Sequence, residues 1–368
     1  MERPIYKPIG SPVEELDTPA LIVDADILKR NIDGVHSFFD SSSALLRPSV
    51  GVHGCPALAH MQLNASGTVG GISVETLGQA ESFNSSGIKD ISINGIIVTD
   101  QKISRLCALA QDSTVTVSVD SASNVKDISN AACALGVTLR ILVAIATKPD
   151  RLGVQPGKPA VELAKVVCNS EGLEFQGFRT HEGTLQIDDV SELSQASVEW
   201  INQVLDTRKL SEAAGINVKT VSVGGTYNYE VAGNTDGVTE VTAGAYALMD
   251  AKYQGKRDGL EPACKVIATV TSFPEELKII TDGGNKAIGM DRGAPVCNEF
   301  PDAVIALSAE HGNVNLANPT NREVVIRDKL WFTPWDMGVT ANLYDYMNVV
   351  RDGRLEAVWE LPARGRYR

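Results

Sequence analysis

The stretch TVTVSVDSASNVKDISNAACALGVTLRILVAIAT, residues 114–147, decides the fold. It contains two runs rich in β-branched residues, 114–121 and 139–147, with an amphipathic segment, 124–135, between them. β-Branched runs favour strands, and apolar residues three and four positions apart favour a helix. The stretch therefore predicts a strand–helix–strand unit whose two strands lie parallel in one sheet.

The same alternation extends over residues 44–249. Eight short strand-like runs follow one another there, and helical segments such as 101–110, 160–167 and 191–214 lie between them. The runs end near His53, Thr76, Val98, Ser121, Thr147, Gly183, Thr226 and Leu248. Eight strands with intervening helices predict an α/β fold of the (β/α)8 barrel class.

After Asp250 the helical periodicity fades. Short alternating segments such as 264–273, 276–284 and 323–332 take its place, separated by turn residues. This pattern is typical of an antiparallel β-domain. We expect a barrel domain over residues 16–255 and a β-domain over residues 256–368, joined by residues 1–15.

The composition excludes some classes of function. Among 368 residues, 46 Asp and Glu outnumber 33 Lys and Arg, which gives a net charge of −13. Such a charge repels a phosphate backbone, so we expect no nucleic-acid partner. The first dozen residues carry charge and proline instead of a signal sequence, and no run is long enough to cross a bilayer. Six cysteines stand singly. We expect a soluble, cytoplasmic protein with reduced thiols and no membrane partner.

In a barrel of this class, reactive groups stand at the carboxyl ends of the strands. Those ends offer two of the five histidines, two cations and several glycines. A third histidine, His311, lies in a turn of the expected β-domain. The candidates at the strand ends are Gly51, His53, Lys148, Arg151, His181, Glu182, Gly224, Gly225, Thr226 and Gly244.

Several segments of the chain resemble those of one known family and follow one another in the same order. They include ELDTPALIVDADILKRNI (15–32), GFRTHEG (177–183), VSVGGTYNY (221–229) and DGGNKAIGMDRGAP (282–295). The chain resembles the D-threonine aldolase and D-serine dehydratase family, which are fold-type III pyridoxal phosphate (PLP) enzymes related to alanine racemase. The resemblance implies a barrel of the alanine racemase type, followed by a β-domain whose loops close the active site, in a homodimer.

One departure removes the anchor of PLP. The first barrel strand of the family ends in a motif close to RPHAKTHK, whose first lysine forms the Schiff base with PLP. Here residues 47–54 read RPSVGVHG, so Gly51 stands at the lysine position, and Ser49 and Gly54 replace the other two polar residues. A Schiff base needs an amine, and glycine has none.

A second departure concerns the metal of related aldolases and dehydratases, which contacts the substrate hydroxyl. The resemblance places its ligands, a histidine and then a cysteine or aspartate, at Asp336 and Gly338. One carboxylate alone makes a poor site for a divalent cation, so we expect no metal.

The phosphate cradle is retained only in part. Gly224, Gly225 and Thr226 keep a glycine-rich turn whose amides could hold an anion, and Gly244 is also present. Ala245 follows Gly244, at a position where the family usually has a serine or threonine. Arg151, which by resemblance would face the pyridine nitrogen, is retained. We therefore read this cradle as vestigial and expect no cofactor.

The remaining groups suit acid–base chemistry. We expect His53, His181, Glu182, Asp336 and His311 to carry it, and Arg151, Lys148, Tyr227, Trp335 and the space at Gly51 to bind a small molecule. The resulting hypothesis is a PLP-independent lyase or isomerase that performs elimination, retro-aldol cleavage, isomerisation or cyclisation on a hydroxylated or cyclic metabolite larger than a simple amino acid. Two alternatives stay open: a PLP-dependent D-amino-acid lyase with noncovalent or relocated PLP, and a non-catalytic ligand-binding protein.

Overall fold

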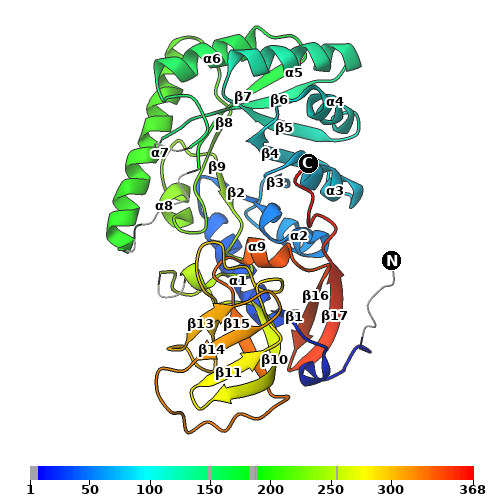
Figure 1. Cartoon of the computed structure of the whole chain (residues 1–368). Helices are drawn as coiled ribbons and strands as arrows, with labels where there is room; N and C mark the ends of the chain where they lie inside the picture. Colours follow the sequence, from blue (N-terminus) through cyan, green and yellow to red (C-terminus); the bar gives the residue numbers. More distant parts are fainter. Residues whose placement is uncertain (1–6, 148–150, 182–186, 188, 254–255) are drawn as a thin grey trace. The chain divides into compact units, whose positions relative to one another are not determined.

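The computed structural model describes residues 7–147, 151–181, 187, 189–253 and 256–368. The chain forms two compact units (Figure 1). The barrel unit comprises residues 35–51, 58–244 and 365–368, and the sheet unit comprises residues 1–34, 52–57 and 245–364. Each unit is described by itself below.

The barrel unit contains eight parallel strands in the order β2-β9-β8-β7-β6-β5-β4-β3. Bridges between Leu46 and Thr68 and between Ser49 and Ser73 join β2 to the β3 side, so the sheet closes on itself. The eight-stranded barrel predicted from the sequence is confirmed. Its strands are β2 (Leu45–Pro48), β3 (Ile72–Val74), β4 (Asp90–Ile96), β5 (Thr114–Val119), β6 (Leu139–Ala144), β7 (Leu173–Arg179), β8 (Thr220–Val223) and β9 (Glu240–Ala243).

Helices surround these strands (Figure 1). Polar side chains cap four helix starts: the side chains of Thr76, Thr99, Ser121 and Asp189 each accept a backbone N–H of the first turn. The strand-to-helix connections are therefore encoded locally. The helices are α2 (Pro56–Leu63), α3 (Leu77–Ser85), α4 (Asp100–Leu109), α5 (Ala122–Leu135), α6 (Lys158–Cys168), α7 (Val190–Ala213) and α8 (Tyr229–Gly233), and α1 (Ala25–Phe39) runs from the sheet unit into the barrel unit.

The sheet unit is built on a mixed sheet in which most neighbours are antiparallel and β1 pairs parallel with β16. Helix α9 (Met337–Ala341) precedes β16 in the chain. The strands are β1 (Ala20–Asp24), β10 (Cys264–Glu275), β11 (Lys278–Thr281), β12 (Val296–Cys297), β13 (Val304–Leu307), β14 (Gly312–Asn315), β15 (Lys329–Thr333), β16 (Tyr346–Arg351) and β17 (Arg354–Glu360).

The division between the units differs in detail from the predicted boundaries. Strand β1, which lies within the predicted barrel range, pairs with β10 and β16 of the sheet unit. Four of its five residues are buried, which suits a central strand. At the other end, the barrel unit stops at Gly244, directly after β9, instead of residue 255.

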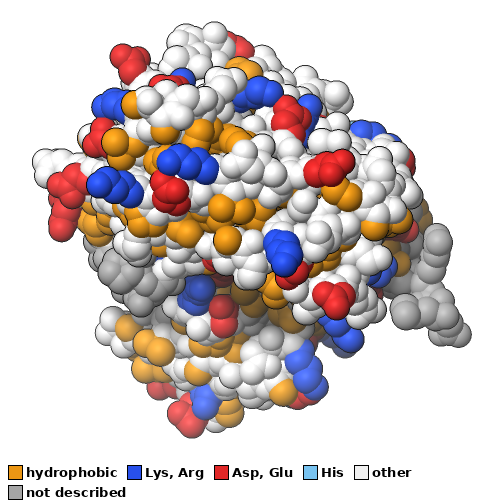
Figure 2. Space-filling view, turned by 90° about the horizontal axis from the view of Figure 1, so that it is seen from above, with side chains coloured by type: hydrophobic (Ala, Val, Ile, Leu, Met, Phe, Trp, Pro, Cys, Tyr) orange, Lys and Arg blue, Asp and Glu red, His pale blue; other side chains and the backbone are white. Residues whose placement is uncertain are grey.

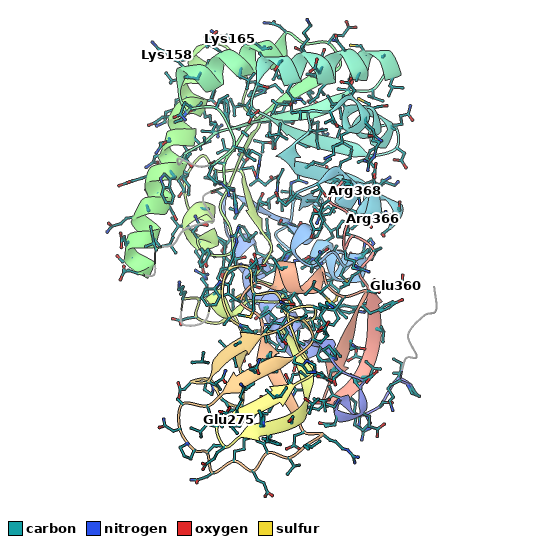
Figure 3. The ribbon with its side chains drawn as sticks, in the orientation of Figure 1. Lys158, Lys165, Glu275, Glu360, Arg366 and Arg368 are labelled. Carbon is teal, nitrogen blue, oxygen red and sulfur yellow. The ribbon has the colours of Figure 1, made fainter. Side chains whose placement is uncertain are left out.

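The C-terminal residues return to the barrel unit. The hydroxyl of Thr76 donates to the carbonyl of Arg366 at 2.6 Å, and the guanidinium of Arg105 donates to the carbonyl of Arg368 at 3.1 Å. Arg366 and Arg368 lie beside α3 in Figure 3. Gly78 allows this approach, because a Cβ there would meet the carbonyl of Arg366 at 2.7 Å.

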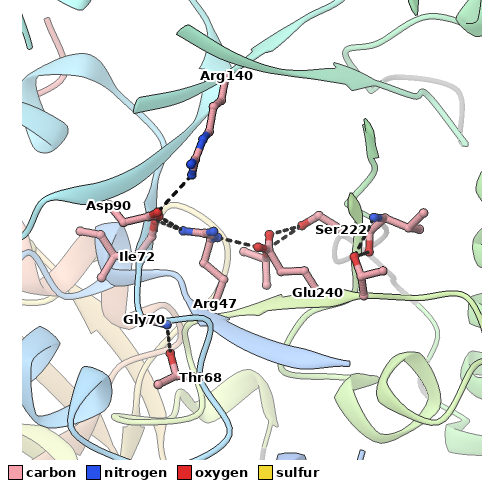
Figure 4. A network of polar contacts seen from close by, with 11 residues as sticks. Arg47, Thr68, Gly70, Ile72, Asp90, Arg140, Ser222 and Glu240 are labelled. Carbon is pink, nitrogen blue, oxygen red and sulfur yellow. Dashed lines mark hydrogen bonds and ion pairs between the residues drawn. The ribbon is translucent and has the colours of Figure 1, made fainter. Parts of the chain in front are cut away.

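A charged network crosses the amino-terminal end of the barrel (Figure 4). Arg47 on β2 forms ion pairs with Glu240 at 2.7 Å and with Asp90 at 2.6 Å, and the last two are the first residues of β9 and β4. The hydroxyl of Ser222 donates to Glu240 at 2.7 Å. The Arg47 side chain is only 12% exposed. Residues at this end of such barrels serve stability, so we assign the network a structural role.

The surface carries charges of both signs. Figure 2 shows Lys, Arg, Asp and Glu side chains interspersed over the face in view. Within the described ranges, no helix is long and apolar enough to span a bilayer.

We predict that Arg47→Met lowers the free energy of unfolding by about 3–5 kcal/mol, because it leaves two carboxylates at the barrel end without their shared cation. Arg140→Met is the matched control. Its side chain is 43% exposed and lies 3.6 Å from Asp90, so its loss should cost less than about 1 kcal/mol. Urea denaturation followed by circular dichroism measures both. Equal effects of the two substitutions would contradict the assignment.

Candidate functional site

The loop after β6 places Arg151 at the carboxyl end of the barrel. Its neighbour Val154 forms a bridge with Ile145, directly after the strand. Gly153, with φ +123°, makes this approach possible, because a Cβ there would lie 2.7 Å from the amide nitrogen of Ala146. The Arg-Leu-Gly-Val sequence thus returns to the strand end, and Arg151 is half-buried there.

His181, two residues after β7, is also half-buried at this end. Its Nδ1 lies 3.1 Å from the carbonyl oxygen of Gly224. Because a carbonyl only accepts, Nδ1 carries the proton, and Nε2 is the acceptor of the neutral ring. The ring lies close to the glycine turn, since a Cβ on Gly225 would meet Cε1 of His181 at 3.4 Å.

Arg179 is a site residue that the sequence analysis missed. It is the last residue of β7, and its Nη1 donates to the carbonyl of Asn94 on β4 at 3.2 Å. Strands β5 and β6 separate β4 from β7 in the sheet, so the Arg179 side chain extends across the barrel interior. Alternation along a strand places residues two apart on one face, which was the available signal that Arg179 accompanies His181.

The positive charges of Arg151 and Arg179 affect the pKa of His181. Burial, and then the guanidinium groups of Arg151 and Arg179, lower the pKa of His181 to about 4, although Glu75 opposes the shift. The imidazole is therefore neutral at neutral pH. A base this weak is poorly matched to proton removal at pH 7, so the geometry favours His181 as a hydrogen-bonding group over the predicted acid–base role.

Gly51 lies beside an ordered glutamine. The side-chain amide of Gln79 donates to the carbonyl of Gly51 at 3.3 Å, and its oxygen accepts the backbone N–H of Glu75 and of Thr76. A Cβ at Gly51 would lie 3.0 Å from Oε1 of Gln79. The glutamine completes the capping box of α3, so it is held next to the position that a lysine would need.

The glycine-rich turn keeps its shape through internal bonds. Gly224 has φ +85°, and the N–H of Gly225 donates to Oδ1 of Asn228 at 2.9 Å. The side-chain amide of Asn228 donates to Ser197 on α7 at 3.1 Å. Thr226 is 3% exposed. Tyr227 is half-buried, and Gly244 is buried directly after β9.

In the sheet unit, Asp336 belongs to an ion-pair cluster. Lys252, within the short helix η3 (Ala251–Tyr253), places its Nζ 2.9 Å from Oδ2 of Asp336 and 2.8 Å from Oδ2 of Asp250. The remaining carboxylate oxygens accept backbone amides, that of Val339 at Asp336 and that of Met337 at Asp250. Every carboxylate oxygen in the cluster thus has a donor.

The two carboxyl groups of the cluster differ in pKa. Burial raises the pKa of Asp250 to about 6, although Lys252 opposes this. At Asp336, burial is outweighed by the Lys252 ammonium and two backbone amides, so its pKa lies below the ordinary value. Asp336 is therefore an ionised helix cap at neutral pH, bound to a lysine that the sequence analysis did not single out.

The other predicted residues of the sheet unit have local roles. His53 is 2% exposed, and its Nδ1 accepts the N–H of Cys55 at 3.1 Å, just before α2. His311 is exposed in the turn between β13 and β14. Trp335 packs on Gly293, where a Cβ would meet its ring at 2.5 Å. The roles in catalysis or binding that the sequence analysis gave to His53, His311 and Trp335 stay predictions.

The structure brings together four predicted residues of the barrel unit: His181 with Arg151, and His181 with Gly224 and Gly225. Two further candidates, Lys148 and Glu182, lie outside the described residues.

Comparison with known proteins places this geometry in a family. The N-terminal domain of alanine racemase matches residues 23–252, and a serine dehydratase domain matches residues 263–350. The 3-hydroxy-D-aspartate aldolase of Paracoccus denitrificans (strain Pd 1222) is 32% identical over 97% of this chain and 94% of its own length. The D-threonine aldolase of Arthrobacter sp is 30% identical over 97% of this chain and 95% of its own length.

A solved structure agrees with these matches. The crystal structure of D-threonine aldolase from Filomicrobium marinum has a TM-score of 0.93, with 30% identity, and the match covers 98% of this chain and 99% of that one. The fold and site define a protein with an alanine racemase-like barrel followed by a second domain. The chain belongs to the family of D-threonine aldolases and D-serine dehydratases within this class.

These findings correct two predictions. The hypothesis of a PLP-independent lyase or isomerase acting on a larger metabolite is wrong, because aldolases of 3-hydroxy-D-amino acids match nearly the whole chain. The expectation of no cofactor is wrong for the same reason, since this family uses PLP. Both errors came from giving the local departures at Ser49, Gly51, Gly54 and in the phosphate cradle more weight than the collinear similarity of the whole sequence.

The residues of the barrel unit fit PLP in part. The glycine turn and Arg151 suit a phosphorylated, aromatic ligand, and the guanidinium groups add positive charge. At Gly51, by contrast, there is no amine, and Gln79 borders the position. The site fits PLP held noncovalently and does not fit attachment at residue 51.

The metal position of the family does not fit a divalent ion in the arrangement shown. Gly338 has no side chain to ligate with, and both oxygens of Asp336 already accept donors from Lys252 and Val339. Within the described ranges, no cluster of three or more His, Cys, Asp or Glu could hold a metal. We derive no step that uses one.

We predict that the His181 imidazole stays neutral from pH 8 to pH 5, because its pKa lies near 4. Below about pH 6.5 the unfolded chain binds a proton at this residue while the folded chain does not, so His181 costs stability as the pH falls from 6.5 toward 4. Proton–carbon NMR of histidine-labelled protein measures the titration, and His181→Gln assigns the signal. A His181 signal that titrates near pH 6.5 would contradict the prediction.

Proposed function

We propose that this protein is a lyase that cleaves 3-hydroxy-D-amino acids and holds PLP without a covalent bond at residue 51. The observation that carries the proposal is the similarity to such aldolases over 97% of the chain. D-Threonine and 3-hydroxy-D-aspartate share a D-configured α-carbon and a hydroxyl on the next carbon. We infer that this common part is the reacting portion of the substrate.

The carboxyl end of the barrel would hold PLP through the turn at residues 224–226 and through Arg151. When bound, PLP would supply an electron-withdrawing ring that stabilises the negative charge left when a bond to the α-carbon of an amino acid breaks. The missing lysine therefore removes the anchor of the cofactor and leaves this chemistry available.

The residues of the barrel unit would orient the ligand. With its Nδ1 proton held by the carbonyl of Gly224, His181 presents Nε2 as an acceptor and cannot turn its ring without losing that bond. A neutral acceptor suits an ammonium or hydroxyl donor of the ligand. Arg151 and Arg179 make the surroundings positive, which favours an anionic ligand.

Other properties stay predictions. The resemblance implies a homodimer, and we propose a small molecule as the ligand. Gly51 specifically favours a second candidate function, a non-catalytic protein that binds PLP or an amino acid, because a fixed lysine is the usual anchor and proton carrier in this family. Turnover separates the two candidates.

We predict that added PLP raises the melting temperature of the purified protein and that the loaded protein releases glycine from D-threonine or 3-hydroxy-D-aspartate. Arg151→Met should weaken PLP binding about tenfold or more, because it removes a charge-assisted contact. Arg140→Met, at the other end of the barrel, is the control and should bind PLP as the unmodified protein does. Binding of PLP without product from either amino acid would select the non-catalytic candidate, and a failure to bind PLP would contradict the proposal.

A further inference from the structure

One face of the sheet in the sheet unit carries a cavity of 320 Å³, a volume typical of small-molecule sites. All of its lining residues belong to the sheet unit, and β1, β10, β15 and β16 each contribute to it. The lining combines apolar and charged side chains, among them Ile22, Asp24, Lys265, Glu299, Trp331 and Val350.

The apolar floor of the cavity follows from the alternation of side chains along the strands. Lys265 on β10 lies opposite Ile22 on β1, so both side chains point to the same face of the sheet. In β15, Leu330 and Phe332 are buried on the other face, which leaves Trp331 between them half-buried on this one. The Trp331 side chain packs against the same hydrophobic cluster as Ile22. An indole and aliphatic side chains thus form the floor.

Glu299 has one carboxylate oxygen left for a ligand. Its Oε2 accepts the backbone N–H of Trp331 at 2.9 Å and lies 3.7 Å from Sγ of Cys297. Among the residues that the structure describes, no donor meets Oε1. The contacts of Oε2 hold the carboxylate at the wall of the cavity, and Oε1 is available to an ammonium donor.

Lys265 supplies the opposite charge without pairing to Glu299. Its ammonium makes no ion pair or side-chain hydrogen bond within the described part of the chain, although Asp24 and Glu299 line the same cavity. Asp24 has a different task, because its Oδ1 accepts the backbone N–H groups of Asp26 and Ile27 at the start of α1. An ammonium and a carboxylate oxygen that line one cavity and stay apart leave room for a ligand that carries both charges.

We propose that this cavity binds an α-amino acid with an apolar side chain, in its zwitterionic form. Lys265 receives the carboxylate of the ligand, Glu299 receives the ammonium, and the indole of Trp331 contacts the side chain. A purely apolar ligand would leave both protein charges without a partner. The proposal goes beyond the proposed function and does not depend on it, because the cavity uses no residue of the barrel unit.

Isothermal titration calorimetry on the full chain, without added PLP, tests the proposal. The ligands are L-leucine, L-phenylalanine and two analogues of leucine: 3-methylbutylamine, which lacks the carboxylate, and 4-methylpentanoate, which lacks the ammonium. We expect L-leucine to bind at least about tenfold more tightly than either analogue, because each analogue loses one charge-assisted contact. Leaving out PLP prevents an imine between the cofactor and the ligand.

Two variants assign the contacts. Lys265→Met should remove the advantage of L-leucine over 3-methylbutylamine and keep its advantage over 4-methylpentanoate. Glu299→Gln should do the reverse, because it removes the partner of the ammonium. Lys286→Met is the matched control, since Lys286 pairs with Glu310 at the surface of the same unit and does not line the cavity. It should leave the binding of L-leucine unchanged.

Four results would overturn the proposal: no binding of either amino acid, equal affinity for L-leucine and its two analogues, an unchanged affinity for L-leucine in both cavity variants, or loss of L-leucine binding in Arg151→Met, which would place the amino acid at the barrel. The comparison of ligands on the unmodified protein decides the matter even if a variant does not fold. Lyase activity enters none of these measurements, so its absence would count against the proposed function alone.

Discussion

The ion pairs of Arg47 are the constraint on which the barrel depends. One guanidinium, almost without contact to solvent, links β2 to β9 and β4 at the amino-terminal end of the strands. Such a group is costly to bury and is tolerated only because both carboxylates meet it at short distance. With stability concentrated at this end, the carboxyl ends of the same strands are free to vary in chemistry while the fold is kept.

The site residues lie at or near such strand ends. Gly51 follows β2 and borders Gln79 of α3, and Arg179 ends β7 and donates to the carbonyl of Asn94 across the barrel interior. In the sheet unit, Asp336 is bound to the ammonium of Lys252.

The sequence allowed the eight strands, the barrel and the family to be predicted, because β-branched runs, capping residues and collinear motifs are local signals. It did not reveal Gln79, Arg179 or Lys252. Gln79 belongs to a local capping box, but its contact with Gly51, 28 positions away, is set by tertiary structure. The same holds for the partners of the other two residues: Asp336 lies 84 positions from Lys252, and Asn94 lies 85 positions from Arg179. The low pKa of His181 was equally hidden, since it depends on burial, on Arg151 from another segment and on Arg179, whose side chain extends into the barrel interior. The error about the cofactor arose because a few local substitutions were allowed to outweigh the whole pattern.

The central claim is that this barrel holds PLP without a covalent bond at residue 51. Mass spectrometry of the PLP-loaded protein tests it most directly, with native spectra of the untreated protein and denaturing spectra after borohydride reduction, which makes any imine to the protein permanent. The account predicts one PLP on each chain in the native spectrum and no phosphopyridoxyl group on the reduced, denatured chain. A PLP adduct that survives denaturation, or no PLP in the native spectrum, would contradict it.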